Sequence, residues 1–165
     1  MGTVAAIVAL AALVRSGGRD QPEHYVEVDP TSGISVSVEA TSSALTVEVR
    51  QFSVKIGYFR VSTFGAASWQ VATMPEDCRQ AWEDLGRPTL WIVRGAKWYV
   101  PKLRGEGLGR AVYEKLLSYV TARGGWLAPG RCSGTGTSAD AERVWQSLRR
   151  THRSSGPFLR SSSID

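Results

Sequence analysis

The chain has 165 residues, 42% of them hydrophobic and 21% charged, and its formal net charge is +5 at pH 7. This length and composition exclude a disordered chain and suffice for one sizeable core. We therefore expect a single domain over residues 1–160 and a disordered tail at 161–165. The positive charge favours an anionic partner but leaves its kind open.

Arginines are concentrated near the end of the sequence, at Arg143, Arg149, Arg150, Arg153 and Arg160. A basic face here could meet a cofactor phosphate, a nucleic acid or an acidic protein. The alternative is a solvated helix end whose arginines complement the helix dipole.

The opening stretch from Gly2 to Val14 is almost wholly apolar. No basic region precedes it, and its length of about 13 residues is less than the roughly 20 that a membrane-spanning helix needs. We therefore expect a buried helix or strand here, in preference to a signal peptide or a membrane anchor.

The two cysteines, Cys78 and Cys132, lack CxxC spacing and have no paired histidines nearby. This pattern predicts neither a disulfide framework nor a zinc or other metal site. A reducing, cytoplasmic compartment is the expectation that follows.

The first half of the chain reads as strands after a Gly-, Asp- and Pro-rich break at residues 16–30. Apolar and polar residues alternate with a period of two, which is typical of half-buried strands. The predicted strands of this antiparallel meander are 34–38, 45–49, 54–63 and 68–73, the last two flanking a turn at 64–67.

A short helix over residues 75–86 comes next, because Pro75 is suited to a first helical turn and Gly86 to a helix end. A long strand over 89–100 follows it. Gly95 interrupts this strand and predicts a bulge or a close backbone approach.

The period then changes to that of a helix. Apolar residues recur every four positions over 107–123, Gly124 and Gly125 end the segment, a short strand fits 126–128, and a second helix fits 138–150. A strand, a helix and another strand in this order form a parallel crossover. The expected fold is therefore α/β (α+β), with a mixed sheet that combines an antiparallel meander and a βαβα half.

The segment between strand 89–100 and helix 107–123 has the ingredients of an anion-binding loop. Glycines allow a phosphate to approach the backbone, and the amides at the helix start carry partial positive charge. Neither a dinucleotide fingerprint nor a Walker A loop fits its residues.

The run from Tyr99 to Gly109, Y-V-P-K-L-R-G-E-G-L-G, resembles motif A of the GNAT superfamily of acyl-CoA N-acyltransferases, often written V-x-P-x-x-R-G-x-G-x-G. The resemblance covers residues 89–150 and implies a GNAT-like fold with acetyl-CoA as co-substrate. It implies that main-chain groups of Trp98 and Val100 bind the pantetheine arm, and that the thioester lies where strands 89–100 and 126–128 diverge. The implied pyrophosphate-binding residues are Leu103, Arg104, Gly105, Glu106, Gly107, Leu108 and Gly109.

Catalytic residues are not assigned by the resemblance. The family's usual strand carboxylate is absent from Leu90–Val100, and no tyrosine follows Tyr119 to act as the acid. The remaining candidates are Glu76, Asp77 or Glu83 as a base, and Ser138 or His152 as a group near the thiolate; each also reads as a structural residue.

The function expected from these features is acetyl transfer from acetyl-CoA to a primary amine of a small molecule, a protein or an aminated nucleobase. A catalytically inactive CoA-binding or nucleic-acid-binding module with this fold is the alternative. No membrane partner is expected, and a homodimer is left open.

Overall fold

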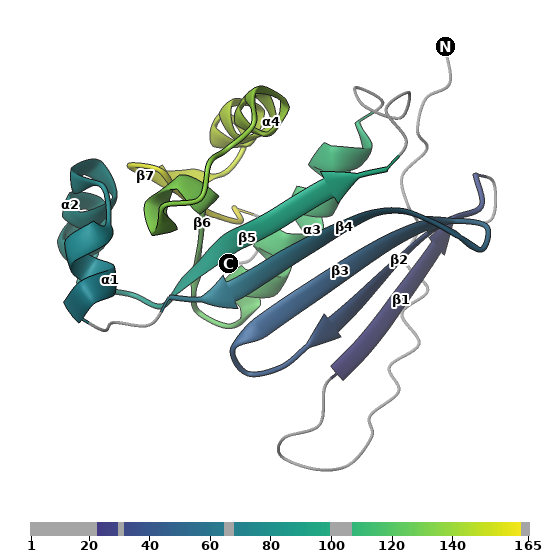
Figure 1. Ribbon diagram of the computed structural model, residues 1–165, viewed down its shortest axis with the longest axis horizontal. Coiled ribbons are helices and arrows are strands. Elements are labelled where there is room, and N and C mark those ends of the chain that lie inside the picture. The colour runs from purple at the N-terminus through teal and green to yellow at the C-terminus, as the bar shows by residue number, and fades with distance from the viewer. Residues whose placement is uncertain (1–22, 30–31, 65–67, 100–106, 163–165) are drawn as a thin grey trace. The chain divides into compact units, whose positions relative to one another are not determined.

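A computed structural model describes residues 23–29, 32–64, 68–99 and 107–162 (Figure 1). The chain divides into two compact units. The first unit contains the described residues up to Val61 together with those of Gly95–Leu108, and the second contains those of Ser62–Arg94 and Gly109–Asp165. The apolar segment Gly2–Val14 lies outside the described residues.

The first unit is built on an antiparallel meander. Its strands are β1 (Glu23–Asp29), β2 (Ile34–Ala40), β3 (Ala44–Gln51) and β4 (Val54–Thr63), in that order across the sheet. Figure 1 shows β1, β2 and β3 side by side, and β2 pairs with β3 so that Val36 is opposite Val49. The buried side chains of β2, β3 and β4 include Val36, Ala40, Leu45, Val47, Val49, Ile56, Phe59 and Val61.

The predicted meander is confirmed for three of its strands, and its fourth member is β1. Residues 23–29 were expected in the polar break, yet they pair with β2 along its whole length. Residues 68–73, expected as a strand, form helix α1 (Ser68–Thr73), so that prediction is wrong. Six residues are too few for the apolar pattern to separate a strand from a helix.

The short helix of the second unit is confirmed as α2 (Glu76–Asp84). Pro75 precedes it with φ of −53°, and Glu76 and Asp77 lie in its first turn, where carboxylates complement the helix dipole. Cys78, Ala81 and Trp82 form its buried face.

The predicted crossover is confirmed in the second half of the chain. Strand β5 (Leu90–Trp98) leads through the loop to helix α3 (Leu108–Ala122), which is followed by strand β6 (Trp126–Ala128). The two strands are parallel, with Leu90 opposite Trp126. Gly124, with φ of +75°, ends α3 as expected. A Cβ on Gly95 would meet no atom of the described residues within 4 Å, so these residues do not supply the close backbone approach that was one of the two expectations there.

The end of the second unit differs most from expectation. After the 3-10 helix η2 (Gly130–Ser133) and helix α4 (Ala139–Arg149), the chain forms the hairpin β7 (Arg153–Ser155) and β8 (Phe158–Arg160). Strand β8 pairs antiparallel with β6, with Leu127 opposite Leu159. The amide of Ser161, at the start of the expected disordered tail, donates to the Thr121 hydroxyl at 2.9 Å.

The parallel β5–β6 pair and the antiparallel β6–β8 and β7–β8 pairs make the sheet mixed, as predicted. The fold is of the mixed α and β class. No helix in the part of the chain that the structure describes is long and apolar enough to cross a membrane.

Candidate cofactor site

The predicted cofactor loop begins after β5 and ends at the start of α3. Of its predicted binding residues, Trp98, Gly107, Leu108 and Gly109 are described by the structure. Val100, Leu103, Arg104, Gly105 and Glu106 lie outside the described residues. The Trp98 side chain packs edge-on against Phe59, with ring centroids 5.6 Å apart, so its indole is a packing group.

Gly107 has a conformation that favours glycine. Its φ is +80°, and a Cβ built there would meet no atom of the described residues within 4 Å. A side chain at Gly107 would therefore be strained by the backbone, while no described residue would block it. Leu108, the next residue, begins α3 and is buried. Because residue 107 is a glycine, it places no side chain in the path by which an anion would reach the first amides of α3.

Strands β5 and β6 pair only over a short length. The register joins Leu90–Ile92 to Trp126–Ala128, whereas β5 continues to Trp98. Beyond this register the chain turns at Pro129 into η2, and Gly130 passes so close to β5 that a Cβ would lie 2.8 Å from the Val93 carbonyl oxygen. Ligands of parallel sheets bind at such carboxyl ends of strands.

The loop between η2 and α4 is rich in hydroxyl groups. Ser133 and Thr135 both donate to the Gly130 carbonyl, at 3.0 and 2.7 Å. Thr137 differs, because its Oγ1 atom is buried and has no hydrogen-bond partner within the described parts of the chain. An unpartnered buried hydroxyl costs free energy, which a ligand with a matching polar group would recover.

Ser138 is the N-cap of α4. Its Oγ accepts a hydrogen bond from the Ala141 amide at 3.2 Å, which selects it over Thr137 as the capping residue. The structural interpretation of Ser138 is thus confirmed, and a role near the thiolate stays a prediction.

The acidic candidates occupy α2. Glu76 is exposed in the first turn. Asp77 accepts two hydrogen bonds from Arg131, at 2.6 and 3.1 Å, and these hold the pKa of its carboxyl below the usual value. Glu83 lies 3.8 Å from Arg87. A carboxylate held as an anion by an arginine is a weak base, so Asp77 is the poorest candidate of the three.

His152 is fixed by protein groups at both ring nitrogens. Its Nδ1 accepts a hydrogen bond from the Ser162 amide at 3.3 Å, and its Nε2 lies 2.6 Å from a Glu114 carboxylate oxygen. In the neutral imidazole the proton is therefore on Nε2. Arg110 extends this cluster by pairing with Glu114 and by donating to Ser147 and Thr151. The cluster joins α3 to the end of α4, which supports the structural interpretation of His152. A role of His152 near the thiolate stays a prediction.

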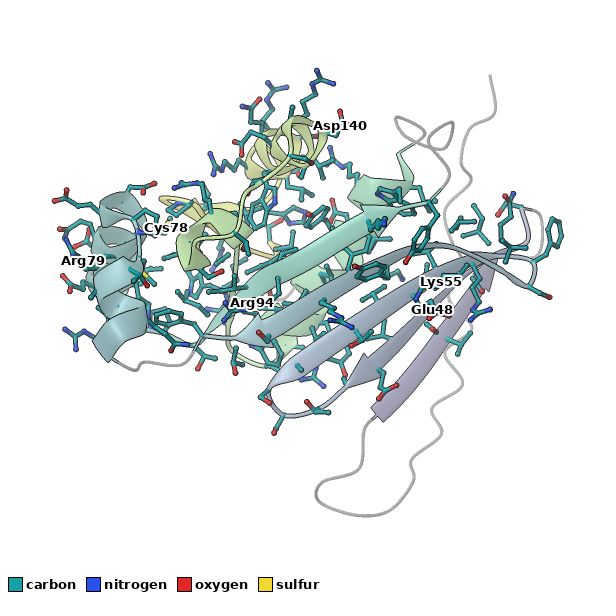
Figure 2. All side chains as sticks on the ribbon, viewed as in Figure 1. Glu48, Lys55, Cys78, Arg79, Arg94 and Asp140 are labelled. Carbon is teal, nitrogen blue, oxygen red and sulfur yellow. A yellow bond between two sulfur atoms is a disulfide. The ribbon has the colours of Figure 1, made fainter. Side chains whose placement is uncertain are left out.

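Cys78 and Cys132 form a disulfide, which corrects the expectation that neither cysteine is paired. The bond joins α2 to η2 and is drawn in yellow beside α2 in Figure 2. Both cysteines are fully buried among Met74, Trp82 and Phe158. The argument for a reducing compartment rested on unpaired thiols and no longer stands.

No group of three or more His, Cys, Asp or Glu side chains within 23–29, 32–64, 68–99 and 107–162 is placed to hold a metal ion. No protein-family model, curated protein or solved structure matches the chain.

Proposed function

We propose that this chain is a GNAT-type N-acyltransferase that transfers an acetyl group from acetyl-CoA to a primary amine. The observation that carries the proposal is the motif A sequence Arg104–Gly109, which follows β5 in the chain and ends within the first turn of α3, in a parallel crossover. Two features of the described residues support it: the open, positive-φ conformation of Gly107, and the short pairing of β5 with β6.

In this proposal the loop amides and the start of α3 bind the pyrophosphate, because both present N–H groups to an anion. The acceptor nitrogen attacks the thioester carbonyl carbon, the carbon–sulfur bond breaks, and CoA leaves as the thiolate. A thiol pKa near 8.5 makes a protein acid dispensable, whereas the amine must first lose a proton to water or to a base. Thr137 is a candidate for a polar contact with the ligand, since its hydroxyl is buried and unpartnered.

Isothermal titration calorimetry with acetyl-CoA tests the proposal. Gly107→Leu should abolish binding, because a side chain would enter the approach to the helix start. Gly86→Leu is the matched control, since Gly86 also has a positive φ (+79°) and open space around it. Both variants should lose similar stability, on the order of 1–2 kcal/mol. Absence of binding by the unmodified protein at high micromolar acetyl-CoA would refute the cofactor assignment.

A catalytically inactive CoA-binding module is the second candidate. Two of the candidate bases on α2 are paired with arginines, Asp77 with Arg131 and Glu83 with Arg87, and a paired carboxylate is a poor base. Strand β5 (Leu90–Trp98) has no carboxylate to replace them. Both observations favour the inactive module. A thiol-release assay over a panel of primary amines separates the two. Release above the rate of hydrolysis supports the enzyme, and cofactor binding without release supports the inactive module.

A further inference from the structure

The outer face of β4 and the end of β5, both in the first unit, carry aromatic and cationic side chains side by side. We call this the aromatic–cationic surface and define it by Lys55, Tyr58, Arg60, Lys97 and Tyr99. Tyr99 is 46% exposed, and the three cations are exposed as well.

The two tyrosine rings form the centre of this surface. Their centroids are 6.1 Å apart and their planes are inclined by 37°. The Tyr99 amide donates to the Ile56 carbonyl at 2.8 Å, which fixes the end of β5 against β4. The rings therefore stand on hydrogen-bonded backbone, and this arrangement limits the ordering that a ligand would have to impose.

Each ring has a cation over it. Lys55 Nζ lies 5.2 Å from the Tyr58 centroid, and Lys97 Nζ lies 5.2 Å from that of Tyr99. The Arg60 guanidinium adds a third positive charge 6.0 Å from the Tyr58 centroid. Aromatic rings and positive charges thus lie together on two adjacent strands.

A break in the alternation of β4 creates this surface. Ile56 and Gly57 are consecutive and both buried, whereas strict alternation would expose one of them. An extra residue of this kind is typical of a β-bulge. Its effect is that Lys55, which precedes the break, shares the outer face with Tyr58 and Arg60, which follow it.

Few carboxylates of the described residues oppose these charges. Glu48 on β3 lies 3.3 Å from Lys55 and 2.5 Å from Arg50. Figure 2 labels Glu48 and Lys55. Glu39 is on β2, opposite Thr46 of β3, and so is separated from β4 by a strand. With Arg50 included, four cations face one nearby carboxylate among the side chains that the structure describes, and this part of the surface is positive.

We propose that the aromatic–cationic surface binds single-stranded nucleic acid. Unpaired bases stack on aromatic rings while the backbone phosphates meet lysine and arginine, and a sheet face with exposed rings is a recurrent platform for this mode. A duplex keeps its base faces stacked internally and cannot use the rings. An acidic peptide would use the cations alone. The paired rings therefore favour the single strand.

Fluorescence anisotropy with a labelled oligothymidylate of about 12 nucleotides tests the proposal, since single-stranded sites span roughly 4–16 nucleotides. The assay contains no acyl-CoA, so its outcome is independent of the proposed acyltransferase activity. The protein should bind the single strand at least tenfold more tightly than a duplex of equal length.

Substitutions of the rings give the sharpest comparison. The double variant Tyr58→Ala/Tyr99→Ala should weaken binding at least tenfold, because stacking is lost. The double variant Tyr58→Phe/Tyr99→Phe should bind as the unmodified protein does. The control is Tyr119→Ala, which removes a partly exposed tyrosine with its own arginine neighbour, Arg123, from α3 and should leave affinity unchanged.

A second measurement keeps the proposal testable even if the alanine variant misfolds. Lys97→Gln should reduce the slope of log affinity against log salt concentration by about 0.7, as expected for one phosphate contact to a single strand. The proposal is overturned by failure to bind the oligonucleotide at low salt, or by alanine variants of the two rings that fold and bind normally. It is equally overturned by an unchanged salt slope, by equal weakening in Tyr119→Ala, or by preferential binding of an acidic peptide or anionic vesicles.

Discussion

Arg131 holds both carboxylate oxygens of Asp77, with Nη2 2.6 Å from Oδ2 and Nη1 3.1 Å from Oδ1. These hydrogen bonds lower the pKa of Asp77 from 3.8. A depressed carboxyl pKa stabilises the fold above the unfolded pKa, and this contribution is lost as the pH falls through the folded value. The side chains are 56% and 37% exposed, so solvent screening limits the contribution to about 0.5–1 kcal/mol.

Urea unfolding at pH 6 and pH 3 measures this effect. Asp77→Asn should lose less stability over this interval than the unmodified protein. Asp140→Asn is the control, because its ion pair with Arg143 is more exposed (60% and 78%). Identical acid sensitivity of the unmodified protein and Asp77→Asn would contradict the assignment.

The Cys78–Cys132 disulfide should contribute substantially to stability, because it links residues 54 positions apart. Crosslinks of this span typically stabilise by about 2–4 kcal/mol, chiefly by restricting the unfolded chain. Adding a reductant should lower the urea midpoint of the unmodified protein, whereas Cys78→Ala/Cys132→Ala should be insensitive to it. Titration of two free thiols in denaturant without reductant would show that the bond is not formed.

Gly130→Ala should destabilise the fold by about 1–3 kcal/mol, because the new Cβ would lie 2.8 Å from the Val93 carbonyl and 2.9 Å from the Thr135 hydroxyl. Gly136→Ala is the matched control in the same loop, since a Cβ there meets no atom within 4 Å. Thermal unfolding should show a clear loss for the first variant only. Equal melting temperatures would mean that η2 is not held this close to β5.

Burial raises the pKa of Tyr113 to about 12, against a smaller opposing effect of a hydrogen bond with Trp145. The stability linked to this phenol is fully present below the unfolded pKa of about 10 and is lost as the pH rises through the folded value. Two pKa units correspond to roughly 2–3 kcal/mol. Unfolding free energies between pH 9 and pH 12 should fall more steeply for the unmodified protein than for Tyr113→Phe. Parallel profiles would contradict the burial of the hydroxyl.

The spacing of apolar residues along the sequence predicts the β5–α3–β6 crossover well. The four-residue period of α3 and the glycine that ends it act within the helix itself, and the burial of Val112, Leu116 and Val120 follows directly. The same holds for Ser138, whose capping bond reaches only to Ala141.

Features that depend on tertiary contacts are not evident from the sequence. The β7–β8 hairpin follows an arginine-rich helix end and is stabilised by the pairing of Leu159 with Leu127, over 32 positions (159 − 127). The Cys78–Cys132 pair likewise exists because α2 and η2 pack together around Met74, Trp82 and Phe158. Spacing in the sequence carries no sign of either contact.

The consecutive burial of Ile56 and Gly57 lets β4 keep one inner and one outer face on both sides of the break. Removal of Gly57 would leave a strand of strict alternation, in which Lys55 and Tyr58 still face outward and Phe59 still faces inward. Removal of Phe59 would instead turn the Arg60 guanidinium toward the core. The display of the tyrosine pair therefore tolerates a deletion at the break and is sensitive to one only two residues further along the strand.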